Sequence, residues 1–194
     1  MEGDQGCTIK VWIEGTFKGL GSVYGKHLYY KSVQNKDFWD ANNYCGGFGG
    51  HLVIINNAKE NNFVSNLCKN GNYFMGLSDF NQEQVWRWVD GTLCRVVNWN
   101  WAQCPGGPSQ GGGNECRLIT DYGYNNWANG EPNNCGGYNC EFAESIAVFN
   151  NDGTWNDIPP GGQGNFVMEW EFIPTSGAID NLFRQEHQDY QYPW

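Results

Sequence analysis

The sequence predicts an α+β domain in which two short helices and several short strands surround one long, irregular loop region. Apolar residues of 36–45 recur at i, i+3 and i+7, and Asn57 is placed to cap a second helix. Short alternating or continuously apolar runs indicate strands before and after these helices. From Leu93 to about Tyr138 the periodicity is lost and Gly, Asn, Cys, Trp and Pro dominate. A loop this long inside a compact domain is typical of a functional region.

The elements follow one another in a simple order. The first helix ends at Gly46-Gly47, and the second carries Glu60, Phe63, Val64 and Leu67 on one face. Strands are expected at 8–13, 28–31, 52–55, 73–77, 85–89, 145–149 and 166–172. We interpret 28–173 as one domain with an insertion at about 93–121. An N-terminal strand extension (1–27) precedes it and an aromatic C-terminal tail (174–194) follows it.

Composition narrows the class of function. The chain has 194 residues, 40% hydrophobic and 16% aromatic, which argues against disorder. Its formal net charge of −10 repels phosphate backbones and anionic membranes and favours cations, so neither nucleic acid nor membrane insertion is expected. No apolar run reaches the roughly 20 residues of a membrane span.

The cysteine count points to an oxidising compartment. Eight cysteines are many for a reducing environment and are even in number, which favours an extracellular or surface-exposed protein. The first ten residues lack the basic and apolar regions of a signal peptide, so we expect a mature form or another route.

Nothing in the sequence predicts an enzyme. His27, His51 and His187 show no metal or nucleophile spacing, and no Gly-X-Ser-X-Gly motif or phosphate loop occurs. The many carboxylates of the chain leave one alternative open, an acidic pair for glycoside hydrolysis. The expectation is a binding protein without catalysis.

Six local motifs occur in one recognisable order between about Leu28 and Phe172. They are Phe38, Ala41 and Cys45 with Gly49-Gly50-His51-Leu52-Val53; Glu60-Asn61 with Phe63-Val64; Phe74-Met75-Gly76-Leu77; Trp86-Arg87-Trp88-Val89-Asp90-Gly91; Glu131-Pro132-Asn133; and Trp155-Asn156-Asp157. In this order they resemble the C-type lectin-like domain family. The resemblance implies two helices flanking small antiparallel sheets, with a long calcium-binding loop region.

Two family disulfides are missing from the sequence. Met168 stands where the partner of Cys45 would be, so no bond is expected from the first helix to the last strand. The second pair is replaced, with Phe142 at one position and Pro159-Pro160 near the other. The chain therefore resembles the disulfide-poor branch of the family. Cys135 and Cys140 are interpreted as a local disulfide rather than as zinc ligands.

The resemblance also implies a Ca²⁺ site. Carboxylates and side-chain amides suit calcium, which takes six to eight oxygen ligands. The expected ligands are Glu131, Asn133, Glu141, Asn156 and Asp157. Pro132 suits a cis peptide that turns its two neighbours towards one point. Asn134 stands where an acidic residue often supports an auxiliary calcium, which argues against a second metal. Taken alone, 131–134 is better interpreted as a plain turn. Trp155-Asn156-Asp157 at a suitable distance downstream reverses this in favour of a calcium site.

In the family, the same groups bind sugar through the metal. The expected sugar-binding residues are Glu131, Asn133, Asn156 and Asp157, with Tyr138 as a stacking residue. The Glu-Pro-Asn order implies mannose, glucose, GlcNAc or fucose-type ligands. Trp127 and Trp155 are expected in the core instead.

A rival interpretation is an interaction or structural module of a larger surface or extracellular assembly, without sugar binding. The inserted loop and the tail favour it, because Leu182, Phe183, Tyr190, Tyr192 and Trp194 are anchors of the kind found at interfaces. Residues 181–194 are expected either to pack on their own domain or to bind a protein partner.

Overall fold

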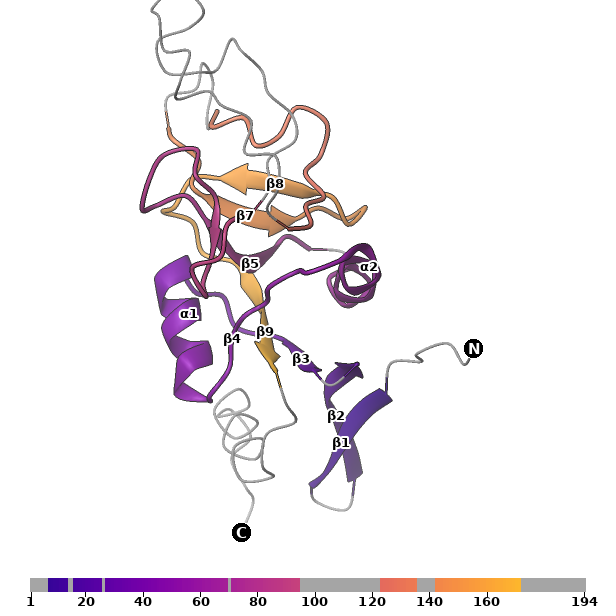
Figure 1. Cartoon of the computed structure of the whole chain (residues 1–194). Coiled ribbons are helices and arrows are strands. Elements are labelled where there is room, and N and C mark those ends of the chain that lie inside the picture. The colour runs from indigo at the N-terminus through magenta and orange to yellow at the C-terminus, as the bar shows by residue number, and fades with distance from the viewer. Residues whose placement is uncertain are drawn as a thin grey trace, which may run out of the picture.

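The computed structural model describes residues 7–13, 16–25, 27–69, 71–94, 123–135 and 142–171, with the backbone alone for residues up to 21. It confirms the α+β class (Figure 1). The elements are β1 (Cys7–Ile13), β2 (Thr16–Tyr24), β3 (His27–Lys31), α1 (Phe38–Gly47), β4 (His51–Leu52), α2 (Ala58–Leu67), β5 (Tyr73–Ser78), β6 (Arg87–Trp88), β7 (Ile146–Phe149), β8 (Trp155–Ile158) and β9 (Asn165–Trp170).

The strands form one sheet in the order β1-β2-β3-β9-β5-β7-β8, with β4 also paired to β9 and β6 to β5. The pairing is antiparallel except between β5 and β9, which run parallel. The sheet is therefore mixed, whereas the expectation was antiparallel sheets. In Figure 1, β9 lies at the centre, and α1 and α2 lie on opposite sides of it. Strands β7 and β8 lie at the end of the sheet opposite β1 and β2, which we call the loop end.

Both helices begin at residues that cap them. The Asp37 side chain accepts a hydrogen bond from the Asp40 amide, and the Asn57 side chain accepts from the amides of Lys59 and Glu60. The predicted cap at Asn57 is confirmed. The first helix runs from Phe38 to Gly47, so the Gly46-Gly47 pair that was expected to end it forms its last two residues.

The buried core lies on both faces of the central strands. One cluster contains Trp88, Trp127 and Trp155 with residues of β5 and β7, and the other packs α1 against β9. Trp155 is fully buried and Trp127 is 8% exposed, so both are core residues as expected. The Trp155 indole donates to Asn61 Oδ1 at 2.8 Å, which ties β8 to α2.

Three local predictions differ from the structure. The glycine-punctuated segment before Tyr24 forms β2, because it pairs along its whole length with β1. The buried run at 52–55 contributes only Leu52 to β4, and β6 is limited to two residues. Strand β8 was not predicted, since its four residues alone carry no clear alternation.

Phe142 lies outside the hairpin of β7 and β8. Phe142 is 59% exposed and lies before β7, whereas the fully buried Ile146 begins the strand and pairs with Ile158 across the hairpin. The register of this hairpin is set by its turn, in which Gly153 has φ +84°, a conformation that favours glycine. The predicted strand at 145–149 is confirmed as β7, which begins at Ile146.

The buried thiols agree with a disulfide-poor core. Cys45 and Met168 are both fully buried in the cluster that packs α1 on β9, and Cys45 is not disulfide-bonded. Burial raises the pKa of the Cys68 and Cys94 thiols to about 12. Within the described part of the chain, no helix is long and apolar enough to cross a membrane. The predictions for the 93–121 insertion and the 174–194 tail fall almost wholly outside the described residues.

Candidate metal and ligand site

Two segments meet at the loop end of the sheet. The first is the loop 131–135, which begins with a cis peptide between Glu131 and Pro132, as expected from the sequence. The second is β8, which carries Asp157. The chain just before the first segment is anchored to β8, because the Ala128 amide donates to the Trp155 carbonyl at 2.8 Å.

Asp157 organises the loop through its carboxylate. It is fully buried, and its two oxygens accept hydrogen bonds from the amides of Asn133 at 3.0 Å and Asn134 at 2.7 Å. These bonds turn the loop so that the side chains of Glu131 and Asn133 lie beside the carboxylate. The structure therefore brings together three of the predicted ligands from two separate segments.

Two oxygen atoms at this place are buried without a hydrogen-bond donor. They are Oε2 of Glu131 and Oδ1 of Asn133, one on each side of Pro132. A buried acceptor with no partner costs about 1–3 kcal/mol. A bound cation would satisfy both atoms, and the surrounding donor set of carboxylate and amide oxygens suits calcium.

Glu144 is a further carboxylate of this site, and it was missed from the sequence. It is 8% exposed, its Oε2 accepts from the Cys135 amide at 3.1 Å, and its own amide donates to Asn134 Oδ1 at 2.7 Å. Its charge acts on Glu131, whose pKa it helps to raise. The predicted fifth ligand, Glu141, lies outside the described residues. Glu144, three residues further along the chain, places its carboxylate beside the loop 131–135.

Two more acidic residues lie next to this group. Asp79 is 3% exposed and Glu83 accepts a hydrogen bond from Asn134 Nδ2 at 2.7 Å. Burial is the main cause that raises the pKa of both carboxyls, and the charge of Asp157 raises both further. Asp79 and Glu83 lie four residues apart directly after β5, and this pair of acidic residues is the sequence signal that could have found them. They add negative potential next to the predicted ligands.

The carboxylates of the site lie close enough together to raise one another's pKa. Burial, followed by the hydrogen bond and charge of Asp157, raises the pKa of Glu131 to about 7. Burial and the charge of Asp157 also raise the pKa of Glu144. Within the described part of the chain, no lysine or arginine forms an ion pair with these carboxylates. A proton or a cation must therefore balance the charge.

Of the remaining predicted site residues, Asn156 alone lies in the described part of the chain. Asn156 lies next to Asp157 on β8 and donates through Nδ2 to the Asp157 carbonyl at 2.8 Å. Tyr138 and Cys140 lie outside the described residues, so stacking on a sugar and the pairing of Cys140 stay predictions. Cys135 is disulfide-bonded.

A family model described as the lectin C-type domain matches residues 34–160, about two thirds of the chain. The chain belongs to the C-type lectin domain family. This lectin domain is 32% identical over 131 residues to human C-type lectin domain family 10 member A, a match that covers 66% of the chain and 32% of the relative. The chain thus spans about a third of that relative's length.

Solved structures agree with this assignment. The carbohydrate-recognition domain of the mouse scavenger receptor C-type lectin has a TM-score of 0.58 to this lectin domain and 25% identity, and the match covers 79% of the chain and 94% of that structure. A calcium-independent type II antifreeze protein has a TM-score of 0.56 at 18% identity, covering 85% and 98%, which shows the shared fold alone. The family model and the relatives named here are lectin domains, which agrees with the expectation of a binding protein.

Proposed function

We propose that this lectin domain binds carbohydrate through a calcium ion held by Glu131, Asn133, Glu144, Asn156 and Asp157. The observation that carries the proposal is the pair of buried, unpartnered oxygens on Glu131 and Asn133 beside the fully buried Asp157. Three carboxylates and two amides supply an all-oxygen set for a hard cation. Glu144 takes the place that the sequence gave to Glu141.

We further propose that the ligand is a mannose, glucose, GlcNAc or fucose-type sugar. A calcium ion held by the protein on one side keeps positions for two vicinal hydroxyls on the other. Glu131 accepts and Asn133 donates hydrogen bonds to those hydroxyls, which fixes their orientation. We also propose an extracellular or surface-exposed location, because the chain has eight cysteines and Cys135 is disulfide-bonded.

Titration with monosaccharides in calcium and in EDTA tests the proposal. We expect methyl mannoside to bind with a Kd of about 1 mM, or about 4 kcal/mol, only when calcium is present. Galactose should not compete. If a broad glycan array in calcium gives no signal, the rival interaction or structural module is correct. The fold it shares with a calcium-independent antifreeze protein is compatible with that rival.

Exchanging donor and acceptor should change the sugar preference. In the double variant Glu131→Gln with Asn133→Asp, the carboxylate and the amide change places across Pro132 while the number of charges is kept. We expect mannose binding to be lost, with galactose binding either gained or also absent. Direct binding to immobilised mannose and to immobilised galactose measures both. Unchanged mannose preference in a variant that still binds calcium would contradict the assignment of these two residues.

Calcium affinity should depend on pH near neutrality. The pKa of Glu131 is raised from 4.5 to about 7, so in the metal-free state its protonated form stabilises the fold at low pH and that contribution is lost as pH rises through about 7. Calcium must displace this proton, and its affinity should therefore fall as pH falls below about 7. Calorimetry at pH 6, 7 and 8 measures the effect.

Two variants separate this effect from general charge changes. Glu131→Gln should bind calcium weakly and with little pH dependence between 6 and 8. Glu171→Gln removes one exposed carboxylate away from the site and should keep the wild-type dependence. If the calcium affinity of the wild-type chain does not change between pH 6 and 8, Glu131 is not protonated in this range.

A further inference from the structure

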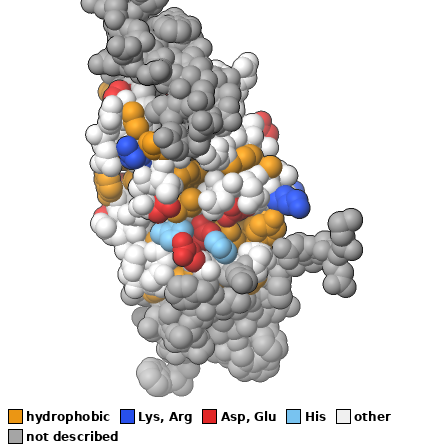
Figure 2. Space-filling view, viewed as in Figure 1, with side chains coloured by type: hydrophobic (Ala, Val, Ile, Leu, Met, Phe, Trp, Pro, Cys, Tyr) orange, Lys and Arg blue, Asp and Glu red, His pale blue; other side chains and the backbone are white. Residues whose placement is uncertain are grey.

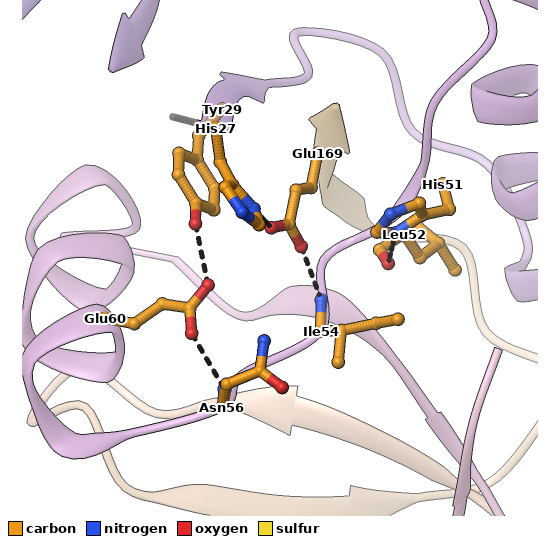
Figure 3. Close-up of polar contacts among 8 residues, drawn as sticks. All are labelled: His27, Tyr29, His51, Leu52, Ile54, Asn56, Glu60 and Glu169. Carbon is orange, nitrogen blue, oxygen red and sulfur yellow. Dashed lines mark hydrogen bonds and ion pairs between the residues drawn. The ribbon is translucent and has the colours of Figure 1, made fainter. Parts of the chain in front are cut away.

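Most of the large aromatic side chains in the described part of the chain lie in the interior. Tyr29 is an example, because it is 1% exposed and its hydroxyl donates to Glu60 Oε1 at 2.6 Å. Glu60 in turn forms a polar cluster with His27 and Glu169 between β3, α2 and β9 (Figure 3). Trp39 of α1 differs from these interior rings, since it is 54% exposed. Tryptophan is a mostly buried residue, and an exposed one that is rigidly held offers a ligand a large apolar surface.

Trp39 is held in place by two phenylalanine rings. Its ring centroid lies 5.5 Å from that of Phe38 and 4.8 Å from that of Phe80. Phe38 and Phe80 contact each other at 5.7 Å, so the three rings form one group, which we call the aromatic platform. Phe38 is 1% exposed and fixes the group to the core cluster that packs α1 on β9. A surface that is ordered before binding costs a ligand less entropy than a mobile one.

The turn that carries Phe80 connects the aromatic platform to the candidate calcium site. Phe80 follows Asp79, a 3% exposed residue whose carboxylate accepts from the Gln84 amide at 2.8 Å. Glu83 of the same turn accepts from Asn134 Nδ2 at 2.7 Å, and Asn134 lies in the loop of the calcium site. The platform and that loop are therefore joined through one short turn with a defined conformation.

The side chains near Trp39 decide which ligand chemistry fits. Asn42 and Asn43 lie three and four residues further along α1, on the same helix face as Trp39, and Asn43 is exposed. Asp40 is exposed in the first turn, and α1 contains no lysine or arginine. Lysine and arginine side chains are also sparse on the described part of the surface in Figure 2. An anionic ligand would be repelled here, whereas a neutral, hydroxylated ring meets a flat apolar surface with amides beside it.

A sugar ring has this combination of groups. One face of a pyranose presents mainly C–H groups that pack on the face of an indole, while the hydroxyls at its edge bond to amides. We propose that Trp39, held by Phe38 and Phe80, contacts a second sugar ring of the ligand, and that this lectin domain therefore recognises an oligosaccharide. The inference rests on the proposed function, because it adds a contact for the same ligand that the calcium ion holds.

Calorimetric titration of the full-length protein in calcium with two ligands tests the proposal. Methyl mannoside has a single ring, which occupies the calcium site only, whereas a branched high-mannose oligosaccharide has further rings that reach beyond it. In Trp39→Ala we expect unchanged affinity for methyl mannoside and about fivefold weaker affinity for the oligosaccharide, the size of one lost aromatic contact. Trp39→Phe keeps a flat ring and should lie between the wild type and alanine.

Controls separate this contact from an effect on the fold. Because Trp39 is exposed, its variants should keep the wild-type melting temperature in calcium to within a few degrees. Val33→Ala is the matched control, since it removes apolar surface from another residue, 63% exposed, and should bind both ligands like the wild type. The indole N–H resonance of Trp39, identified by its absence in Trp39→Phe, gives a second readout. It should shift with the oligosaccharide and stay in place with methyl mannoside.

Three results would overturn the proposal. The first is a Trp39→Ala variant that binds the oligosaccharide as tightly as the wild type does. If sedimentation then shows that the same variant loses self-association, the occupant of the platform is a second copy of the chain. The second is an equal fall in affinity for both ligands, which would mean that Trp39 acts on the calcium site. The third is a Trp39 indole resonance that the oligosaccharide does not move. If methyl mannoside fails to bind in calcium, the proposed function is wrong and this inference fails with it.

Discussion

EDTA should lower the melting temperature of the wild-type chain, and an Asp157→Asn variant should no longer respond to calcium. A ligand that binds only the native state adds RT ln(1 + [L]/Kd) to its stability, about 2.7 kcal/mol at 100 times Kd. For a chain of this size that corresponds to a melting temperature higher by about 5–10 °C. Differential scanning calorimetry in EDTA and in millimolar calcium measures the difference.

Asp157 is chosen because it combines two roles. Its carboxylate is fully buried and holds the amides of Asn133 and Asn134, so it fixes the loop as well as supplying charge. Asparagine keeps the size and one acceptor oxygen but removes the charge that a cation needs. The variant Asn156→Ala with Asp157→Ala should likewise lose the response, and Glu171→Gln should keep it. A wild-type melting curve that is the same in EDTA and calcium would exclude the calcium site.

The Trp155→Ala variant should lose more stability than any other single change considered for this fold. Trp155 is fully buried, and its ring contacts those of Trp88, Trp127 and Tyr124 at centroid distances of 5.7–5.9 Å. Truncation of a buried tryptophan costs about 3–5 kcal/mol. It also removes the indole donor to Asn61 Oδ1, and an acceptor left unpaired costs about 1–3 kcal/mol more.

Urea denaturation of matched tryptophan variants measures this loss. Trp39→Ala is the control, because that side chain is 54% exposed and should lose little stability. Trp155→Phe should lie between wild type and alanine, since it keeps most of the packing but not the donor. A Trp155→Ala variant within about 1 kcal/mol of wild type would contradict the packing described, given typical costs of core truncation. Calcium binding should weaken with it, because Asn156 and Asp157 follow directly on β8.

The sequence determined the order of most helices and strands, because residues within or next to each element mark it. Asn57 caps α2 as predicted, and Glu131-Pro132 forms the expected cis peptide. These features depend on a residue and its near neighbours, whose chemistry is visible in the sequence. The same is true of Glu131, Asn133 and Asp157, since each lies inside a short motif whose spacing is local.

The tertiary structure alone decided the features that depend on pairing over long distances. Glu144 joins the candidate site because it contacts Cys135 and Asn134 of another segment, and no local signal in the sequence shows these contacts. The parallel pairing of β5 with β9 and the cluster of His27, Glu60 and Glu169 have the same origin. His27 and Glu169 are 142 residues apart in sequence, and only the neighbouring positions of β3 and β9 in the sheet bring them together.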